Sequence, residues 1–256
     1  MDKKSIAVLK ELFKAGELNE ALIADLRQDE RKGVQNLIKS YENQILKEKA
    51  LEDKFTKMCR FEQKGYADGH QYIAGMDEAG RGPLAGPVVA AAVILPSNFK
   101  LLGLDDSKQL NKATREKFFF IIKDQAISYG ISIIDSQQID QINIFEATKL
   151  AMRSAIDQLN PKPDHILIDA VNLNGLPCTH EAITKGDTKS VSIAAASVLA
   201  KVTRDKLMQE MHHEYPMYDF ASNMGYGTKN HMTALEVNGA SPYHRRSFAP
   251  VKKVVY

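Results

Sequence analysis

Residues 72–95 read YIAGMDEAGRGPLAGPVVAAAVIL, so that two adjacent carboxylates and a glycine-rich segment lie between two apolar runs. Both runs are short and rich in small or β-branched residues, which predicts two buried strands. The glycines between them predict a tight connection. A carboxylate beside a buried strand loses hydration free energy unless another group compensates its charge. The segment therefore predicts a β-sheet with an acidic group at the end of one strand.

The rest of the chain after this segment alternates between strand-like and helix-like patterns. Apolar runs predict strands at residues 128–135 and 165–171. Helical spacing of apolar residues predicts helices within residues 111–126, 143–159 and 190–215. This alternation predicts an α/β fold in which helices flank a central mixed β-sheet.

The first 70 residues have a different pattern. They contain no proline, and their apolar residues recur at intervals of three and four, which predicts helices, the last from about residue 34 to residue 61. The segment QKGYADGHQ at residues 63–71 then interrupts this spacing. We therefore place a small helical N-terminal module at residues 1–70 and an α/β domain with a helical C-terminal part at residues 71–256. The module is either an arm that engages a substrate or partner, or a stabilising extension.

Composition excludes several classes of protein. The chain is 44% hydrophobic and 26% charged, which is typical of a globular protein. Its two cysteines lack metal-ligand spacing and suit a reducing compartment. No apolar run is long enough for a membrane span, and the charged N-terminus does not resemble a signal peptide. We therefore expect a cytoplasmic protein. A net charge of +2 neither requires nor excludes a nucleic-acid partner.

Four carboxylates stand out by their context. Asp77 and Glu78 follow one apolar run, Asp169 ends another, and Asp187 precedes the long helical segment. Acids that converge at strand ends repel one another unless divalent cations bind them, and two such cations suit phosphodiester cleavage. Neighbouring strand residues point to opposite faces, so Asp77 and Glu78 would share a site only if the strand broke between them, as the following AGRG suggests. Helix capping or surface salt bridges remain the alternative.

Other residues suit a nucleic-acid groove. The segment GRGPLAG at residues 80–86 lacks the spacing of a dinucleotide fingerprint, but its glycines let backbone groups approach a phosphate or ribose. A tight turn is the alternative. Lys108 lies in a polar loop, and Tyr226 lies between glycines, where it could stack on a sugar or base or pack within its loop. The basic segment at residues 243–256 either binds phosphate or is simply solvated.

Taken together, these motifs resemble the bacterial ribonuclease HII family. The matching stretches cover about residues 72–231 and occur in the order GMDEAGRGPLAGPVVAAAVIL, LDDSKQL, ILIDAV, KGDTKSVSIAAASVLAKVTRD and GYGTKNH. The first 70 residues lie outside this common core and are similar to the extension of some Gram-positive members.

The resemblance implies a ribonuclease H-like fold and an endonuclease that acts in ribonucleotide excision repair. Such an enzyme hydrolyses the RNA strand of RNA/DNA hybrids and nicks 5′ of single ribonucleotides in duplex DNA, leaving 5′-phosphate and 3′-hydroxyl ends. The resemblance implies that two Mg²⁺ or Mn²⁺ ions are held by four catalytic acids, namely Asp77, Glu78, Asp169 and Asp187. It also implies that backbone groups of Gly80, Arg81 and Gly82 read the 2′-hydroxyl, that Tyr226 stacks on the neighbouring deoxyribose, and that Lys108 contacts a phosphate.

Three alternatives remain. The related ribonuclease HIII family has lysine in the glycine motif and glutamate as its fourth acid, so Arg81 and Asp187 favour ribonuclease HII. The second alternative is a non-catalytic module that binds hybrids, and the third is another metal-dependent phosphotransferase on the same fold. We expect a monomer whose partners are RNA/DNA hybrids and ribonucleotide-containing DNA, with no membrane association.

Overall fold

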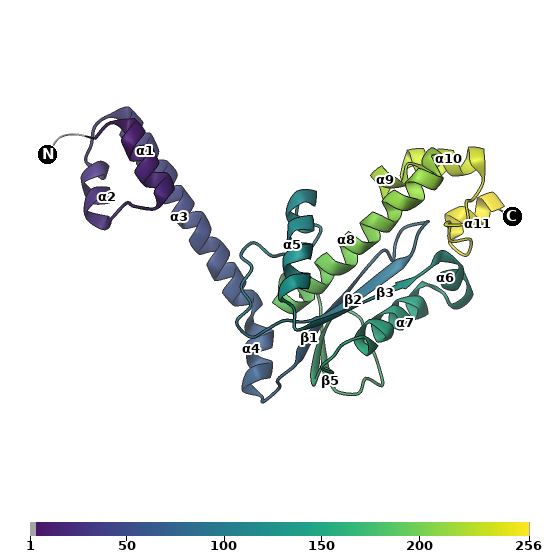
Figure 1. Cartoon of the computed structure of the whole chain (residues 1–256). Helices are drawn as coiled ribbons and strands as arrows, with labels where there is room; N and C mark the ends of the chain where they lie inside the picture. Colours follow the sequence, from purple (N-terminus) through teal and green to yellow (C-terminus); the bar gives the residue numbers. More distant parts are fainter. Residues whose placement is uncertain (1–3, 256) are drawn as a thin grey trace. The chain divides into compact units, whose positions relative to one another are not determined.

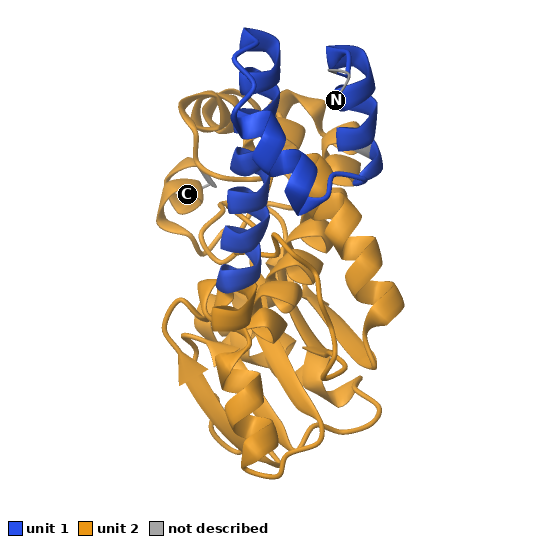
Figure 2. Cartoon of the chain, turned by 90° about the vertical axis from the view of Figure 1, so that its left-hand side faces the viewer, with its two compact units in different colours: residues 1–54 blue, residues 55–256 orange. Residues whose placement is uncertain are grey.

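The computed structural model describes residues 4–255 of the chain, which folds into two compact units of residues 1–54 and 55–256 (Figure 2). The division falls inside a helix rather than at residue 70, where the sequence pattern changes. The reason is that the segment between these two points packs on the sheet. Phe61 and Tyr66 contact a buried cluster that includes Ile73 in the first strand.

The first unit is helical. It contains α1 (Ile6–Ala15), α2 (Glu20–Arg27) and most of α3 (Lys32–Met58). Ser5 and Asn19 cap the first two helices, since their side chains accept hydrogen bonds from backbone N–H groups in the first turn. Among its described residues, the buried cluster of this unit contains the aliphatic residues Leu9, Leu26, Val34 and Ile38. The predicted helical character of this region is confirmed.

The second unit contains a five-stranded mixed sheet, most strands of which are labelled in Figure 1. Its strands are β1 (Ile73–Ala79), β2 (Val88–Ile94), β3 (Ser128–Ile134), β4 (His165–Asp169) and β5 (Thr179–Ile183). The strand order is β3-β2-β1-β4-β5, in which β3, β2 and β1 are antiparallel and β4 and β5 run parallel to β1. The predicted mixed sheet is confirmed, and β5 is a strand that sequence patterns did not predict because four of its five residues are at least partly exposed.

Helices cover both faces of this sheet. On one face lie α5 (Lys112–Gln125) and α8 (Val191–Glu214), which share a core with Val89, Ala91 and Val93 of β2. On the other face lie α6 (Ser136–Ile142) and α7 (Ile144–Asp157), which share a core with the alternate residues of β2. Because both of its faces are covered, β2 is buried along its whole length, as its unbroken apolar sequence predicts.

The remaining short elements surround the ends of these layers. They are α4 (Arg60–Ala67), the 3₁₀ helices η1 (Gly186–Thr188) and η2 (Pro216–Tyr218), α9 (Phe220–Asn223), α10 (Lys229–Asn238) and α11 (Ala249–Val255). Within residues 4–255, every helix is too short or too polar to cross a lipid bilayer.

Helix α8 lies unusually close to β1. A Cβ atom added to Gly75 would lie 2.0 Å from the carbonyl carbon of Ser192, so only glycine fits here. The start of α8 is built from small residues, which allows the same close approach from the helix side. This contact places the N-terminal half of α8, and the η1 turn just before it, beside the end of β1.

Candidate active site

Three aspartates from separate elements converge at one edge of the sheet. Asp77 lies in β1, Asp169 ends β4, and Asp187 lies in η1, and each offers a carboxylate oxygen within 4.8 Å of the others. The parallel pairing of Met76 with Ile168 accounts for the first two, because Asp77 and Asp169 are the next residues of the paired strands. The Oδ1 atom of Asp169 accepts a hydrogen bond of 2.7 Å from the backbone N–H of Gly186, which attaches the η1 turn to β4.

The electrostatics of this trio favour a bound cation. Burial, followed by repulsion from Glu78, raises the pKa of Asp77 well above its usual range. Burial, followed by repulsion from Asp106 and Asp169, raises the pKa of Asp187 to about 6. Carboxylates crowded in this way are relieved by a divalent cation with a preference for oxygen ligands. The donor set therefore fits a divalent metal ion.

Glu78 lies beside the trio but is not part of it. The prediction that β1 breaks between Asp77 and Glu78 is wrong, since regular antiparallel pairing continues past both residues to Ala79. Glu78 consequently points away from Asp77, and its Oε1 atom lies 3.2 Å from Nη1 of Arg81. Its buried Oε2 atom has no hydrogen-bond partner among residues 4–255, which leaves one carboxylate oxygen for a ligand. Burial is the main cause of its raised pKa, and Asp169 contributes to the increase.

Lys108 also lies close to these carboxylates. Its Nζ atom lies 3.8 Å from Asp106 and 4.0 Å from Asp187, while its side chain remains 72% exposed. Both distances are long for an ion pair, so the contacts of Lys108 with these carboxylates are weak. The loop that carries it is held by Arg115 of α5, whose Nη1 donates to the backbone oxygens of Ser107 and Leu110.

Sequence patterns did not identify Ser197 as a site residue, although it lies at the centre of this region. Its hydroxyl hydrogen-bonds to Asp77 and lies 2.9 Å from the hydroxyl of Ser107. A serine among the small residues of a buried helix carries no signal by itself. Only the close packing of α8 on β1 places it beside the acid.

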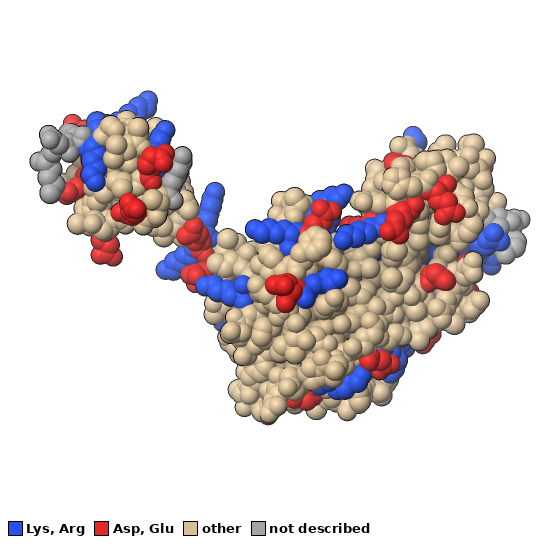
Figure 3. Space-filling model, viewed as in Figure 1, with Lys and Arg blue, Asp and Glu red and all other residues tan. Residues whose placement is uncertain are grey.

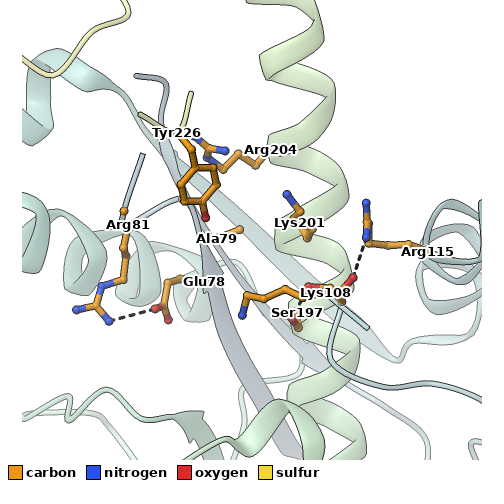
Figure 4. Close-up of a pocket in the computed structure, with 12 residues that line it drawn as sticks. Glu78, Ala79, Arg81, Lys108, Arg115, Ser197, Lys201, Arg204 and Tyr226 are labelled. Carbon is orange, nitrogen blue, oxygen red and sulfur yellow. Dashed lines mark hydrogen bonds and ion pairs between the residues drawn. The ribbon is translucent and has the colours of Figure 1, made fainter. Parts of the chain in front are cut away.

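A cavity of about 440 Å³ lies beside the three aspartates, because two of its lining residues, Lys108 and Ser197, contact Asp187 and Asp77. Figure 4 draws the residues that line it. The cavity brings together several predicted substrate-binding residues with basic side chains of α5 and α8. The lining residues include Glu78, Gly80, Arg81, Gly82, Lys108, Arg115, Ser197, Lys201, Arg204 and Tyr226. Tyr226 is 47% exposed and lies next to Gly82, where a Cβ atom would be 3.6 Å from the tyrosine ring. Basic and acidic side chains are interspersed over the face that carries α5 and α8 (Figure 3).

The basic C-terminal segment is only partly solvated. Arg246 is exposed, but the preceding Arg245 is fully buried and donates hydrogen bonds to backbone oxygens of residues 80–86. Sequence patterns left open whether this segment binds phosphate or is solvated. Arg245 is neither solvated nor placed to bind a phosphate at the surface, because it is buried.

Two buried histidines support the loop of Tyr226. Nδ1 of His231 lies 2.8 Å from the backbone oxygen of Tyr226, so it must carry the proton and donate. Nε2 of His231 then accepts from Nε2 of His244 at 2.9 Å, and Nδ1 of His244 accepts from the backbone N–H of Ser241. When both histidines are neutral, each of their four ring nitrogens therefore takes part in a hydrogen bond. His231 is therefore a structural residue rather than a surface contact for nucleic acid.

This pair predicts a loss of stability in acid. Burial, followed by repulsion from His231, lowers the pKa of His244 to about 4 from its ordinary value of 6.5. Between these values the unfolded state binds more protons than the folded state, so the free energy of unfolding should decrease by at most about 3 kcal/mol as the pH falls from 6.5 to 4. Denaturant unfolding across this range measures the slope. His244→Asn should flatten the profile, whereas His213→Asn, at an exposed position, should not; equal slopes in all three proteins would contradict the assignment.

Comparison with known proteins agrees with the geometry. The profile of the family Ribonuclease HII matches residues 74–251, and that of the Ribonuclease HII N-terminal domain matches residues 5–66. The ribonuclease HII of Oceanobacillus iheyensis is 57% identical over 253 residues, which cover 99% of this chain and 97% of that protein. The ribonuclease HII of Enterococcus faecalis is 51% identical over the full length of both chains.

Solved structures give the same result. Ribonuclease H2 from Pyrococcus horikoshii superposes with a TM-score of 0.64 and 30% sequence identity. The aligned region covers 72% of this chain and 97% of the Pyrococcus chain. Bst-RNase HIII in complex with Mn²⁺ superposes with a TM-score of 0.59 and 20% sequence identity. The aligned region covers 72% of this chain and 69% of the Bst-RNase HIII chain, which shows that the two share a fold. The matches to both parts of the sequence, together with the acidic edge of the sheet, show that this chain belongs to the ribonuclease HII family and is a ribonuclease H endonuclease.

Proposed function

We propose that this enzyme hydrolyses the RNA strand of RNA/DNA hybrids and nicks duplex DNA 5′ of single embedded ribonucleotides, as ribonucleotide excision repair requires. The products carry 5′-phosphate and 3′-hydroxyl ends. The observation that carries the proposal is the position of Asp77, Asp169 and Asp187 beside a basic cavity. That cavity also contains the glycine–arginine backbone and an exposed tyrosine, which are groups suited to a sugar rather than to a base edge.

The acidic residues hold two divalent metal ions, Mg²⁺ or Mn²⁺. Asp77, Asp169 and Asp187 offer convergent oxygens, and Glu78 offers its unpartnered buried oxygen. When bound, such ions supply an activated water and charge stabilisation for the leaving 3′-oxygen. A fold relative, Bst-RNase HIII, is described in complex with Mn²⁺, which supports this class of ion.

The remaining residues of the site bind and orient the substrate. Lys108, whose side chain is largely exposed, contacts a phosphate near the acidic group. Backbone groups of residues 80–82 read the 2′-hydroxyl, which distinguishes RNA from DNA at one position. Tyr226 stacks on the deoxyribose beside the junction. We propose that the enzyme is a monomer that works in the cytoplasm, where reducing conditions suit its two free cysteines.

Cleavage of a duplex with one embedded ribonucleotide tests the proposed specificity. We expect a single nick on the 5′ side of that ribonucleotide, and we expect EDTA to abolish it. A matched all-DNA duplex should remain intact, and a duplex with four consecutive ribonucleotides should also be cut. Cleavage of the longer RNA run alone would indicate ribonuclease HIII-like specificity. Cleavage of the all-DNA duplex would indicate a different phosphotransferase activity.

A further inference from the structure

Two buried arginines hold the backbone that follows β1. Arg204 of α8 is 1% exposed, and Arg245, which precedes α11, is 0% exposed. Within residues 4–255 neither forms a salt bridge, and both guanidinium groups donate to backbone oxygens instead. Burying a charged group without a carboxylate partner is costly unless its hydrogen bonds are all made. The arrangement therefore suggests that the arginines are retained for the backbone conformation that they impose.

Arg245 contacts the glycine–arginine motif directly. Its Nη2 atom donates to the oxygen of Gly80 at 2.6 Å, and its Nη1 atom donates to the oxygens of Arg81 at 3.0 Å and Pro83 at 2.8 Å. Its Nε atom donates to the oxygen of Gly86 at 2.9 Å. One planar group thus fixes the direction of four carbonyl groups in a seven-residue segment.

Arg204 supports the same segment from the helix side. Its Nε and Nη2 atoms donate to the oxygens of Pro87 at 2.9 Å and Ala85 at 3.1 Å. A Cβ atom added to Gly80 would lie 2.1 Å from Nε of Arg204, and Gly80 has a positive φ of 96°. Glycine is therefore required at this position for two reasons: it adopts the positive φ of the turn, and it leaves room for the side chain of Arg204.

The direction of these carbonyls determines the direction of neighbouring N–H groups. In a planar trans peptide the C=O of one residue and the N–H of the next point in opposite directions. Because the oxygens of Gly80 and Arg81 point at Arg245, the N–H groups of Arg81 and Gly82 point away from it. Arg81 and Gly82 line the cavity, whereas Arg245 does not. The buried arginine therefore directs two backbone donors to the cavity side of the motif.

We propose that Arg245, supported by Arg204, is a positioning residue that sets the preference for a ribonucleotide over a deoxyribonucleotide. This inference rests on the proposed function. The two sugars differ by one hydroxyl, so discrimination depends on how well the enzyme's hydrogen-bonding groups are held in place. Lysine cannot replace the arginine, because its three donors radiate from one atom and cannot span four carbonyls as a planar fork does.

Steady-state kinetics of full-length Arg245→Lys tests this inference. The KM is measured on the duplex with one ribonucleotide, and the all-DNA duplex serves as a competitive inhibitor with constant Ki. We expect the ratio of Ki to KM to decrease about 10-fold through a higher KM, as the loss of roughly 1.4 kcal/mol of discrimination implies. The kcat should stay within about threefold and the Ki within about twofold of wild type. Arg246→Lys, an exposed control beside it, should leave all three constants unchanged.

The outcomes separate this inference from the proposed function. A wild-type enzyme that does not nick the single-ribonucleotide duplex would overturn the proposed function itself. A wild-type enzyme that nicks it while Arg245→Lys keeps the wild-type ratio, or weakens KM and Ki equally, would overturn the positioning role alone. If Arg245→Lys shows no cooperative thermal transition, Arg204→Lys replaces it. That variant retains the contacts of Arg245, so a smaller decrease of about threefold in the ratio is required, and an unchanged ratio would refute the inference.

Discussion

Asp77→Asn is expected to lower kcat by at least about 10³-fold, which corresponds to roughly 4 kcal/mol of lost transition-state stabilisation. The amide removes one anionic oxygen from the group that would hold the metal ions, and it cannot restore that charge. Binding of an RNA/DNA hybrid should change by only a few fold, because Asp77 does not line the cavity. Single-turnover cleavage and equilibrium binding of the same hybrid measure the two effects separately.

The same variant should be more stable than wild type when metal is chelated. Asp77 is buried and repelled by Glu78 and Asp169, so a neutral side chain of the same shape removes an unfavourable charge. A higher melting temperature in EDTA, together with lost cleavage, would separate loss of function from misfolding. Asp124→Asn, an exposed acid at the end of α5, is the matched control and should cleave normally. Cleavage by Asp77→Asn within tenfold of wild type would refute the metal-binding role of this residue.

Gly75→Ala is expected to cost more than about 4 kcal/mol of unfolding free energy, a large part of the stability of a typical domain. The added Cβ atom would lie 2.0 Å from the carbonyl carbon and 2.3 Å from the carbonyl oxygen of Ser192. Both are backbone atoms of α8, so the helix as a whole would have to move from β1. We expect little soluble protein, and a greatly reduced urea midpoint for whatever folds.

Gly65→Ala is the matched control for this substitution. Its Cβ atom would lie 2.5 Å from Cδ1 of Ile73, which is the far end of a flexible side chain and can rotate away. Gly65 also lies within α4, where alanine favours the helix by roughly 1 kcal/mol. Its net effect should be within about 1 kcal/mol of zero. Equal unfolding free energies for Gly75→Ala and wild type would show that α8 adjusts to the extra atom.

Much of the secondary structure could be predicted because it follows from local patterns. The apolar run in β2 and the spacing in α5, α7 and α8 correspond closely to the observed elements. Asn111 caps α5 locally, because its side chain accepts a hydrogen bond from the backbone N–H of Thr114. The residue contacts divide the chain at residue 54, within α3, because α4 packs Phe61 and Tyr66 against a cluster that includes Ile73. This packing is a tertiary contact, which helical spacing does not encode.

The sequence by itself determined which acids follow apolar runs, since a carboxylate after such a run is visible within a few residues. Tertiary structure decided how those acids are arranged. Parallel pairing of β1 with β4 brings Asp77 to Asp169, and continuous pairing of β1 with β2 turns Glu78 away. The burial of Arg245 was also decided there, because its hydrogen bonds to Gly80 and Pro83 join residues 165 and 162 positions apart. Hydrophobic periodicity encodes which side of an element is buried, but not which distant backbone groups will face it.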